Sequence, residues 1–218
     1  MGLTVTDLSC DRSGRPVLGG VSLSIAGGEA VLLRGPNGVG KSTLLRALAG
    51  LLPSTGAVAL DGHDLRADRD AYGERIAFAG HLDAIKPQLT VAENLAFWGA
   101  LFGASSVDAA LAEFDLAAIA DRPAHACSAG QKRRLGLARL AVTPRRLWLL
   151  DEPTVSLDAA TRDRFGAVVA RHCGAGGLAL IATHVDLGLP ASREFVLAPL
   201  PRETTRRSDD PFVSGAWT

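Results

Sequence analysis

The chain has 218 residues, enough for one domain with a substantial core. Lys plus Arg and Asp plus Glu number 23 each, so the net charge is zero and there is no basic footprint for nucleic acid. The three Cys are too widely spaced for a disulfide framework or a zinc site, which fits a reducing compartment. We expect no signal peptide, because the N-terminus lacks a basic start followed by an apolar core. No apolar run approaches the roughly 18 residues of a membrane span, so membrane contact is expected only through a partner.

The N-terminal part of the chain is predicted to hold strands near 3–8, 21–25 and 30–34, followed by a helix near 41–50. The strand at 30–34 is a short apolar run rich in Val and Leu, as is typical of a buried strand. The loop after it, Gly35 to Thr43, reads GPNGVGKST. It matches the pattern G-x-x-x-x-G-K-S/T in the strand–loop–helix context that this pattern requires.

This loop is predicted to bind the phosphates of a nucleotide. Its glycines allow a tight turn with backbone N–H groups aimed inward, and the helix N-terminus adds partial positive charge. Lys41 is expected to reach the β- and γ-phosphates, and Ser42 to ligate Mg²⁺. The alternative is a chance match in a Gly-rich turn, which would be rare because Lys is scarce in this chain. The expected nucleotide ligands are Gly35, Pro36, Asn37, Gly38, Val39, Gly40, Lys41, Ser42 and Thr43.

The middle of the chain is predicted to form two strands and then a set of helices. The strands lie near 57–60 and 75–79, and the helices near 90–103, 107–118 and 128–142. Because another strand follows, the helical stretch at about 83–141 is expected to be a subdomain inserted into the sheet. Its most apolar part, 95–102, is either subdomain core or the wall of a groove for a membrane partner's helix, with Trp98 or Phe102 as an anchor.

Residues 128–131 read SAGQ and precede the last of these helices. Ser128 is a good N-cap, and Gly130 removes side-chain bulk so that a phosphate can approach the first turn. Alone, this pattern more often marks a capped helix than a site. Beside a phosphate loop it becomes a second phosphate-recognition element. Two such elements in one chain are best explained if each completes a site with a partner chain.

The C-terminal third opens with a buried strand near 147–151 that ends in two carboxylates. Asp151 suits a water-mediated Mg²⁺ contact, and Glu152 is placed to orient or deprotonate an attacking water. The alternative is a strand end followed by a polar turn at Pro153. The remaining predicted elements are helices near 159–172 and 186–189, strands near 178–182 and 194–198, and a loosely ordered tail over 199–218.

Together these motifs resemble those of the ATP-binding cassette (ABC) ATPases, over residues 3 to 198. The resemblance implies an α/β fold, a P-loop NTPase ABC cassette with a mixed β core and an inserted helical subdomain, spanning 1–198. By position, 35–43 is the Walker A loop, 127–131 the signature, 147–152 Walker B, 155–158 the D-loop and 181–184 the switch histidine segment.

The resemblance also implies roles for the residues of these motifs. ATP with Mg²⁺ would be hydrolysed between two chains paired head to tail, so that Ser128, Gly130 and Gln131 complete the partner's site. Asp158 would join the nucleotide site from the D-loop. His184 would contact the γ-phosphate from the same chain as Lys41. Lys41, Glu152 and His184 are thus the expected catalytic residues.

Three positions depart from the family pattern. The signature begins with Cys127 where the family usually has Leu, and Cys is small and apolar enough to pack there. No aromatic residue lies near position 12 to stack on adenine, so Arg12 is the candidate, through its planar guanidinium. The Q-loop glutamine is missing; counting back from 89–91 gives His81 or Leu82 at that position, and His81 is our choice.

Two segments point to a narrower group. Residues 8–12, and 80–86 ahead of 89–95, resemble the ATP-binding subunits of cytochrome c maturation systems. That resemblance implies an integral membrane partner subunit, a peripheral position on the cytoplasmic face of the bacterial inner membrane, and ATP hydrolysis coupled to haem handling or export for c-type cytochromes. No Cys-x-x-Cys-His motif marks a haem site in the chain itself.

Two other functions remain open from the sequence. A soluble ABC ATPase, such as one for iron–sulfur cluster assembly, would also be a single short cassette. Co-purification with a soluble scaffold rather than a polytopic membrane protein would identify it. A small-molecule kinase could use the same phosphate loop, but it would have no use for SAGQ.

Overall fold

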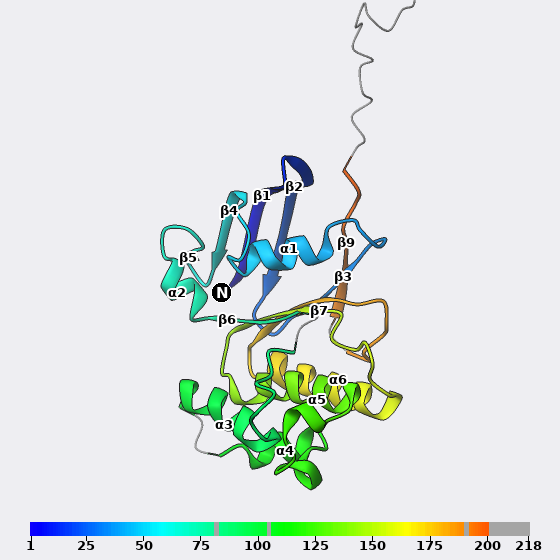
Figure 1. The fold of residues 1–218 in the computed structure, drawn as a ribbon. Helices are drawn as coiled ribbons and strands as arrows, with labels where there is room; N and C mark the ends of the chain where they lie inside the picture. The colour runs from blue at the N-terminus through cyan, green and yellow to red at the C-terminus, as the bar shows by residue number, and fades with distance from the viewer. Residues whose placement is uncertain (81–82, 104–105, 190–191, 201–218) are drawn as a thin grey trace, which may run out of the picture.

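The computed structural model describes residues 1–80, 83–103, 106–189 and 192–200, which form two sheets and a group of helices (Figure 1). The first sheet is antiparallel, in the order β2-β1-β4-β5. Its strands are β1 (Gly2–Arg12), β2 (Arg15–Ala26), β4 (Thr55–Leu60) and β5 (His63–Asp64). β1 and β2 form a hairpin that turns between Arg12 and Arg15. This hairpin brings Arg12 toward the loop that follows β3.

The second sheet is parallel, in the order β6-β7-β8-β3-β9. Its strands are β3 (Ala30–Arg34), β6 (Ile76–Ala79), β7 (Leu147–Asp151), β8 (Leu178–Ala182) and β9 (Ser192–Val196). In register, Ala182 pairs with both Leu33 and Asp151. Because the strands are parallel, their carboxyl ends meet at one edge, where ligands bind in open α/β sheets. The loops after β3, β7 and β8 therefore start side by side.

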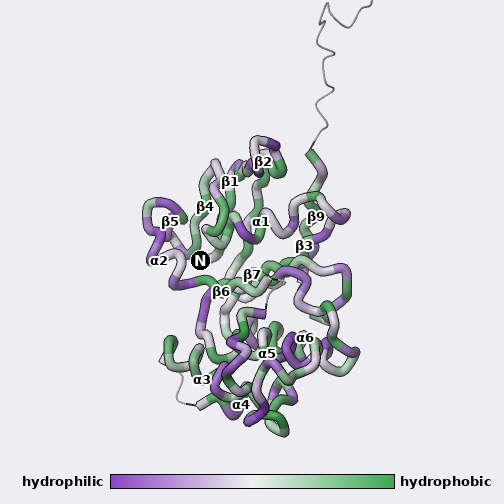
Figure 2. The backbone as a smooth tube through the Cα atoms, viewed as in Figure 1, coloured by the Kyte–Doolittle hydropathy of each residue, from purple (hydrophilic) through white to green (hydrophobic). Residues whose placement is uncertain are grey.

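Apolar side chains fill both faces of the parallel sheet. Leu147 and Leu149 of β7 belong to the core shared with the antiparallel sheet and α1 (Lys41–Leu48), whereas Trp148 and Leu150 belong to the core shared with the other helices. This alternation is what a strand with both faces covered requires. Figure 2 accordingly colours β6 and β7 mostly as hydrophobic. A sheet packed on both faces is a rigid support for the loops at its edge.

The helices that pack below the parallel sheet in Figure 1 are α3 (Val91–Phe102), α4 (Asp108–Glu113), α5 (Ala129–Ala138) and α6 (Ala159–Gly174), with 3₁₀ turns η1 (Ala117–Ile119), η2 (Ala124–Ala126) and η3 (Arg139–Val142). Both α3 and α5 begin with reciprocal capping boxes, Thr90 with Glu93 and Ser128 with Gln131. These pairs satisfy N–H groups that a helix start leaves free. No helix in the described part of the chain is long and apolar enough to cross a membrane.

Several predicted boundaries need correction. The helix predicted over 186–189 is wrong, because Gly188 has a left-handed φ of 61° and its N–H donates to Asp186 Oδ1, which makes a turn. The strand predicted near 21–25 is the end of the longer β2. The helix predicted over 107–118 is α4 followed by η1, and the one over 128–142 is α5 followed by η3. Sequence patterns missed β5 and the short helix α2 (Arg69–Gly73). Most of the predicted tail, 201–218, lies outside the described residues.

Candidate nucleotide site

The loop after β3 has the glycine geometry that its sequence predicts. Gly35, Gly38 and Gly40 have φ values of 139°, 80° and 110°, in the region that L side chains rarely adopt. A Cβ on Gly35 would lie 2.8 Å from Leu197 O, and one on Gly40 would lie 2.8 Å from a methyl group of Leu18. Gly38 has no atom within 4 Å of its Cβ position. The loop is therefore packed from behind at two glycines and open at the third.

Lys41 is the first residue of α1, and its ammonium group contacts carbonyl groups of this loop. Its Nζ donates to Gly35 O at 2.8 Å and to Pro36 O at 3.3 Å, and the residue is only 8% exposed. The same Nζ lies 3.3 Å from His184 Nε2. A buried ammonium held by main-chain carbonyls is well placed to exchange them for phosphate oxygens.

Ser42 and Asp151 lie together, as their predicted metal role requires. Ser42 Oγ donates to Asp151 Oδ1 at 3.0 Å, and Asp151 is buried at the end of β7. A hydroxyl and a carboxylate are the hard oxygen donors that Mg²⁺ prefers, and Mg²⁺ commonly completes its shell with water and substrate phosphates. The described residues contain no group of three or more His, Cys, Asp and Glu able to hold a metal by themselves. The donor set fits a magnesium ion that arrives with a nucleotide.

Glu152 follows β7 with a left-handed backbone, φ 47°, which is unusual for a residue with a side chain. Its N–H donates to Ala182 O at 2.8 Å, and this bond fixes it to the end of β8. Its carboxylate Oε1 lies 3.5 Å from His184 Nε2. The carboxylate is 31% exposed, so a water molecule can reach it.

His184 joins the three segments of the site. Besides Lys41 and Glu152, its Nε2 lies 3.1 Å from Asn37 Oδ1. The residue follows β8, so the parallel register brings it to the phosphate loop. The predicted catalytic residues Lys41, Glu152 and His184 are thus in one cluster, although they are far apart in sequence. Sequence patterns placed Asn37 in the loop but gave no sign of its contact with His184.

Lys41, Glu152 and Asn37 line a cavity of about 490 Å³ at the edge of the sheet, whereas His184 is not among its lining residues. Of the predicted loop ligands, Gly35, Pro36 and Val39 are also outside the lining. Arg12 and Val17, from the β1–β2 hairpin, form one side of the cavity. Arg12 therefore lies where its predicted stacking role needs it, and that role stays a prediction. His81 lies outside the described residues. The described lining consists of Arg12, Val17, Asn37, Gly38, Gly40, Lys41, Ser42, Thr43, Asp151 and Glu152.

The SAGQ residues are not part of this lining. Ser128 Oγ accepts from Gln131 N at 3.2 Å, and Gln131 Oε1 accepts from Ser128 N at 2.9 Å, so both side chains cap α5. A Cβ on Gly130 would lie 3.4 Å from Ser156 O, so this glycine faces the 155–158 segment. In Figure 1, α5 lies among the lower helices and α1 beside the upper sheet. The chain does not bring its own signature to its own phosphate loop.

Asp158 also lies apart from the described lining. Its Oδ1 accepts from Thr161 N at 2.7 Å and so caps α6. That hydrogen bond from the Thr161 backbone holds the pKa of Asp158 below its ordinary value. The predicted nucleotide role of Asp158 is not tested by these contacts. Cys127 is buried, as its apolar replacement of Leu predicts.

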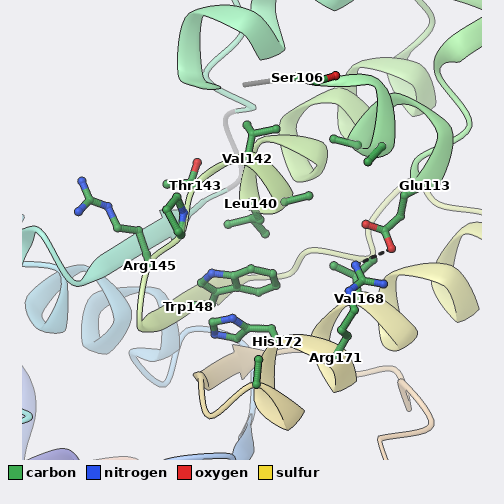
Figure 3. A pocket seen from close by; sticks show the side chains of 15 residues that line it. Ser106, Glu113, Leu140, Val142, Thr143, Arg145, Trp148, Val168, Arg171 and His172 are labelled. Carbon is green, nitrogen blue, oxygen red and sulfur yellow. Dashed lines mark ion pairs between the residues drawn. The ribbon is translucent and has the colours of Figure 1, made fainter. Parts of the chain in front are cut away.

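A larger cavity, of about 590 Å³, lies away from the nucleotide site, between α4, α6 and the start of β7 (Figure 3). Trp148 and His172 stack on its floor, with ring centroids 3.9 Å apart and planes at 4°. Arg171 and Glu113 form an ion pair at 2.6 Å beside it. This cavity contains none of the phosphate-binding groups, so we do not assign the nucleotide to it.

The predicted aromatic anchors on α3, Trp98 and Phe102, are half-buried and line a small cavity of about 120 Å³. The guanidinium of Arg139 lies 5.3 Å from the Trp98 ring, and that of Arg145 lies 4.3 Å from the Phe102 ring. The exposed large apolar side chains of α3 are instead Phe97, 38% exposed, and Leu101, 59% exposed. Phe97 also has a cation over its ring, with Lys86 Nζ 4.3 Å from the ring centre.

Comparison with known proteins adds a family to this geometry. The profile of the ABC transporter family matches residues 18–155. The chain is 52% identical over 217 residues to the cytochrome c biogenesis ATP-binding export protein CcmA of Cereibacter sphaeroides, covering 98% of each chain. It is 51% identical to the protein of the same name from Paracoccus denitrificans, covering 96% of this chain and 95% of that one.

Solved structures agree on the fold. The ATP-binding subunit of an ABC transporter superposes with a TM-score of 0.81 at 24% identity, covering 90% of this chain and 86% of that one. A putative ABC transporter ATP-binding protein from Pyrococcus furiosus superposes with a TM-score of 0.75 at 20% identity, covering 89% and 97%. At these identities the likeness speaks for the fold alone, and it confirms the predicted α/β cassette.

Proposed function

Because the chain belongs to the ABC transporter family, and within it to the cytochrome c biogenesis ATP-binding export proteins, we propose that its site hydrolyses MgATP to drive haem handling for c-type cytochromes. The chain is the ATP-hydrolysing subunit of an export complex of this class. We propose three further details of this function: haem is the substance handled, Mg²⁺ is the metal, and the partners are those described below.

The catalytic proposal rests on the cluster of Lys41, Glu152 and His184 at one edge of the sheet. His184 Nε2 lies 3.3 Å from Lys41 Nζ and 3.5 Å from Glu152 Oε1. Lys41 would exchange its carbonyl partners for phosphate oxygens. Glu152 would accept the proton of the water that attacks the γ-phosphorus, as the bond to the bridging oxygen breaks and ADP leaves. His184, whose Nε2 lies near both of these groups, would contact the γ-phosphate. Mg²⁺, held by Ser42 and Asp151, would neutralise charge on the phosphates.

We also propose that two copies of this chain share each nucleotide. The support is that Ser128, Gly130 and Gln131, whose sequence predicts a phosphate-recognition element, lie at the start of α5 and not in the described lining of their own chain's cavity. A phosphate at the start of α5 would gain from the helix dipole and from those N–H groups of the first turn that the capping box does not bind. In a two-fold dimer, each SAGQ would reach the other chain's phosphate loop.

The remaining partner is an integral membrane subunit, which would place this chain at the cytoplasmic face of the bacterial inner membrane. The support is the export role of the family together with the exposed apolar side chains Phe97 and Leu101 on α3. Phosphate-loop ATPases of iron–sulfur assembly would instead bind a soluble scaffold.

In a strain deleted for the gene, haem-stained c-type cytochromes should return with the wild-type chain and not with Lys41→Ala. Their return with Lys41→Ala would contradict the coupling.

The catalytic proposal is tested with Glu152→Gln. This change removes the proton acceptor but keeps the shape, so turnover should fall by about 100-fold or more, while ATP binding persists. Steady-state phosphate release and nucleotide binding measure the two effects. Glu113→Gln, which changes a carboxylate near the distant cavity, is the matched control and should keep normal turnover. Normal turnover in Glu152→Gln would remove Glu152 from the catalytic role.

A further inference from the structure

Arg133, on the helix that begins with SAGQ, makes an unusual set of contacts. The residue is 6% exposed, yet it carries a charge. Its guanidinium donates to Glu152 O at 2.7 Å, Pro153 O at 3.1 Å, Gly80 O at 3.0 Å and Asp83 Oδ1 at 2.8 Å. Burying a charged side chain is costly unless it is hydrogen-bonded, and here each of the three guanidinium nitrogens donates at least one hydrogen bond. One side chain on α5 thus binds both the catalytic turn after β7 and the segment after β6.

The contact with Glu152 matters because of that residue's backbone. A left-handed φ of 47° is strained for a residue with a Cβ, and such strain persists only where the surroundings hold it. The N–H of Glu152 is held by Ala182 O, and its carbonyl is held by Arg133 Nη2. The peptide groups on both sides of the catalytic carboxylate are therefore fixed, one by β8 and the other by α5.

The other end of the guanidinium fixes α5 to the chain leaving β6. Asp83 pairs with Arg133 and also packs against the helix at Gly136, where a Cβ would lie 2.7 Å from Asp83 Cβ. Small residues at such a position allow backbone segments to approach closely. Because Arg133 is anchored at both ends, α5 has little freedom to shift without moving Glu152.

We propose that Arg133 is a positioning residue that ties the direction of the Glu152 carboxylate to the position of α5. The inference rests on the proposed role of Glu152 as proton acceptor. The planar fork of Arg can donate in parallel to the carbonyls of Glu152 and Pro153, which a single ammonium group cannot do. The position of α5, which begins with SAGQ, and the direction of the Glu152 carboxylate would then both depend on the Arg133 side chain.

The test compares Arg133→Lys and Arg133→Gln in the full-length chain. Both should lower kcat by about 10- to 100-fold, the loss expected when a catalytic group is misplaced by a fraction of an ångström to an ångström. KM for MgATP should stay within about twofold, because Arg133 is not in the described cavity lining. Arg133→Lys keeps a cation opposite Asp83, so it decides the question even if Arg133→Gln folds poorly.

Arg146→Gln is the matched control for lost stability. Arg146 also joins distant segments, with an ion pair to Asp61 at 2.9 Å and a hydrogen bond to Gly176 O, but it lies at the start of β7, away from the site. This variant should lose stability and keep its kcat. Equal kcat values for Arg146→Gln and Arg133→Lys would overturn the proposal.

A second arm separates positioning from general damage. In a Glu152→Gln background, adding Arg133→Lys should change the residual single-turnover rate by less than about twofold, because residues acting as one unit are not additive. A further tenfold loss would show that Arg133 acts elsewhere and would also overturn the proposal. Normal turnover in Glu152→Gln alone would instead contradict the proposed function of Glu152, so the two failures are distinguishable.

Discussion

At the scale of single residues, backbone conformation decides where the reacting groups point. Gly35 and Gly40 adopt conformations that L side chains rarely adopt, and a Cβ on either would lie 2.8 Å from a neighbouring atom. Glu152 adopts a left-handed conformation without being glycine, and hydrogen bonds from two elements hold it there. The site therefore combines glycines, whose backbone adopts these conformations freely, with Glu152, whose strained backbone is held by its surroundings. Such strain is common where a catalytic group needs a fixed direction.

Gly40→Ala tests this account of the loop. Its φ of 110° and the contact with Leu18 should together reduce the free energy of unfolding by about 1–3 kcal/mol. Nucleotide affinity should fall as well, because α1 starts at the next residue. Denaturant unfolding and equilibrium ATP binding measure the two effects. Gly174→Ala, in α6 with no atom near its Cβ position, is the control and should be neutral or slightly stabilising. Equal stabilities for the two variants would contradict the account.

At the scale of elements, β7 and α6 are joined by the stack of Trp148 on His172. The imidazole fills the space that Gly177 leaves, where a Cβ would lie 2.2 Å from the ring. Its Nε2 lies 3.2 Å from Leu178 O, so the ring also contacts the start of β8. Burial lowers the pKa of His172 below its ordinary value of 6.5. A neutral imidazole is thus part of the packing between the helix and the sheet.

The stability of the fold should consequently depend on pH through His172. The unfolded chain binds this proton at a higher pH than the folded chain, so the contribution is fully present above about pH 6.5 and is lost as pH falls through the folded-state pKa. In His172→Phe, the free energy of unfolding should change less between pH 7.5 and 5.5 than in the wild-type chain. Denaturant titrations at each pH measure it. His125→Phe, at an exposed site, should keep the wild-type slope, and an unchanged slope in His172→Phe would refute the assignment.

Sequence reasoning predicted most elements because their signals are local. The apolar runs of β3, β7 and β8 and the N-cap Ser128 of α5 are each complete within a few residues. The motif residues of the site followed from spacing for the same reason. Arg133 could not be found this way, because Lys132 and Arg134 beside it carry the same charge. Its burial depends on carbonyl groups about 20 and 50 residues away. The prediction of a helix at 186–189 was wrong because four residues are too few to show a helical period. Gly188, with its left-handed backbone, forms a turn there instead.

At the scale of the whole molecule, the phosphate loop and SAGQ, the proposed second phosphate element, lie in different layers. The phosphate loop and α1 pack with the antiparallel sheet, whereas SAGQ starts a helix packed on the opposite face of the parallel sheet. Two separate cores on the two faces keep these layers distinct. A single copy therefore has one complete phosphate loop, one unpaired signature among its described residues, and no arrangement that brings them together. Pairing of two copies would use both.

Mixing two inactive variants tests this pairing most directly. Lys41→Ala should leave a chain whose SAGQ is intact, and Ser128→Arg should leave one whose phosphate loop is intact. Each alone should hydrolyse ATP at a background rate. An equimolar mixture should regain about a quarter of wild-type activity, since about half of randomly paired dimers hold both variants and each such dimer has one whole site. Wild-type turnover by Ser128→Arg alone, or a mixture that stays at background although the chains pair, would contradict the shared site.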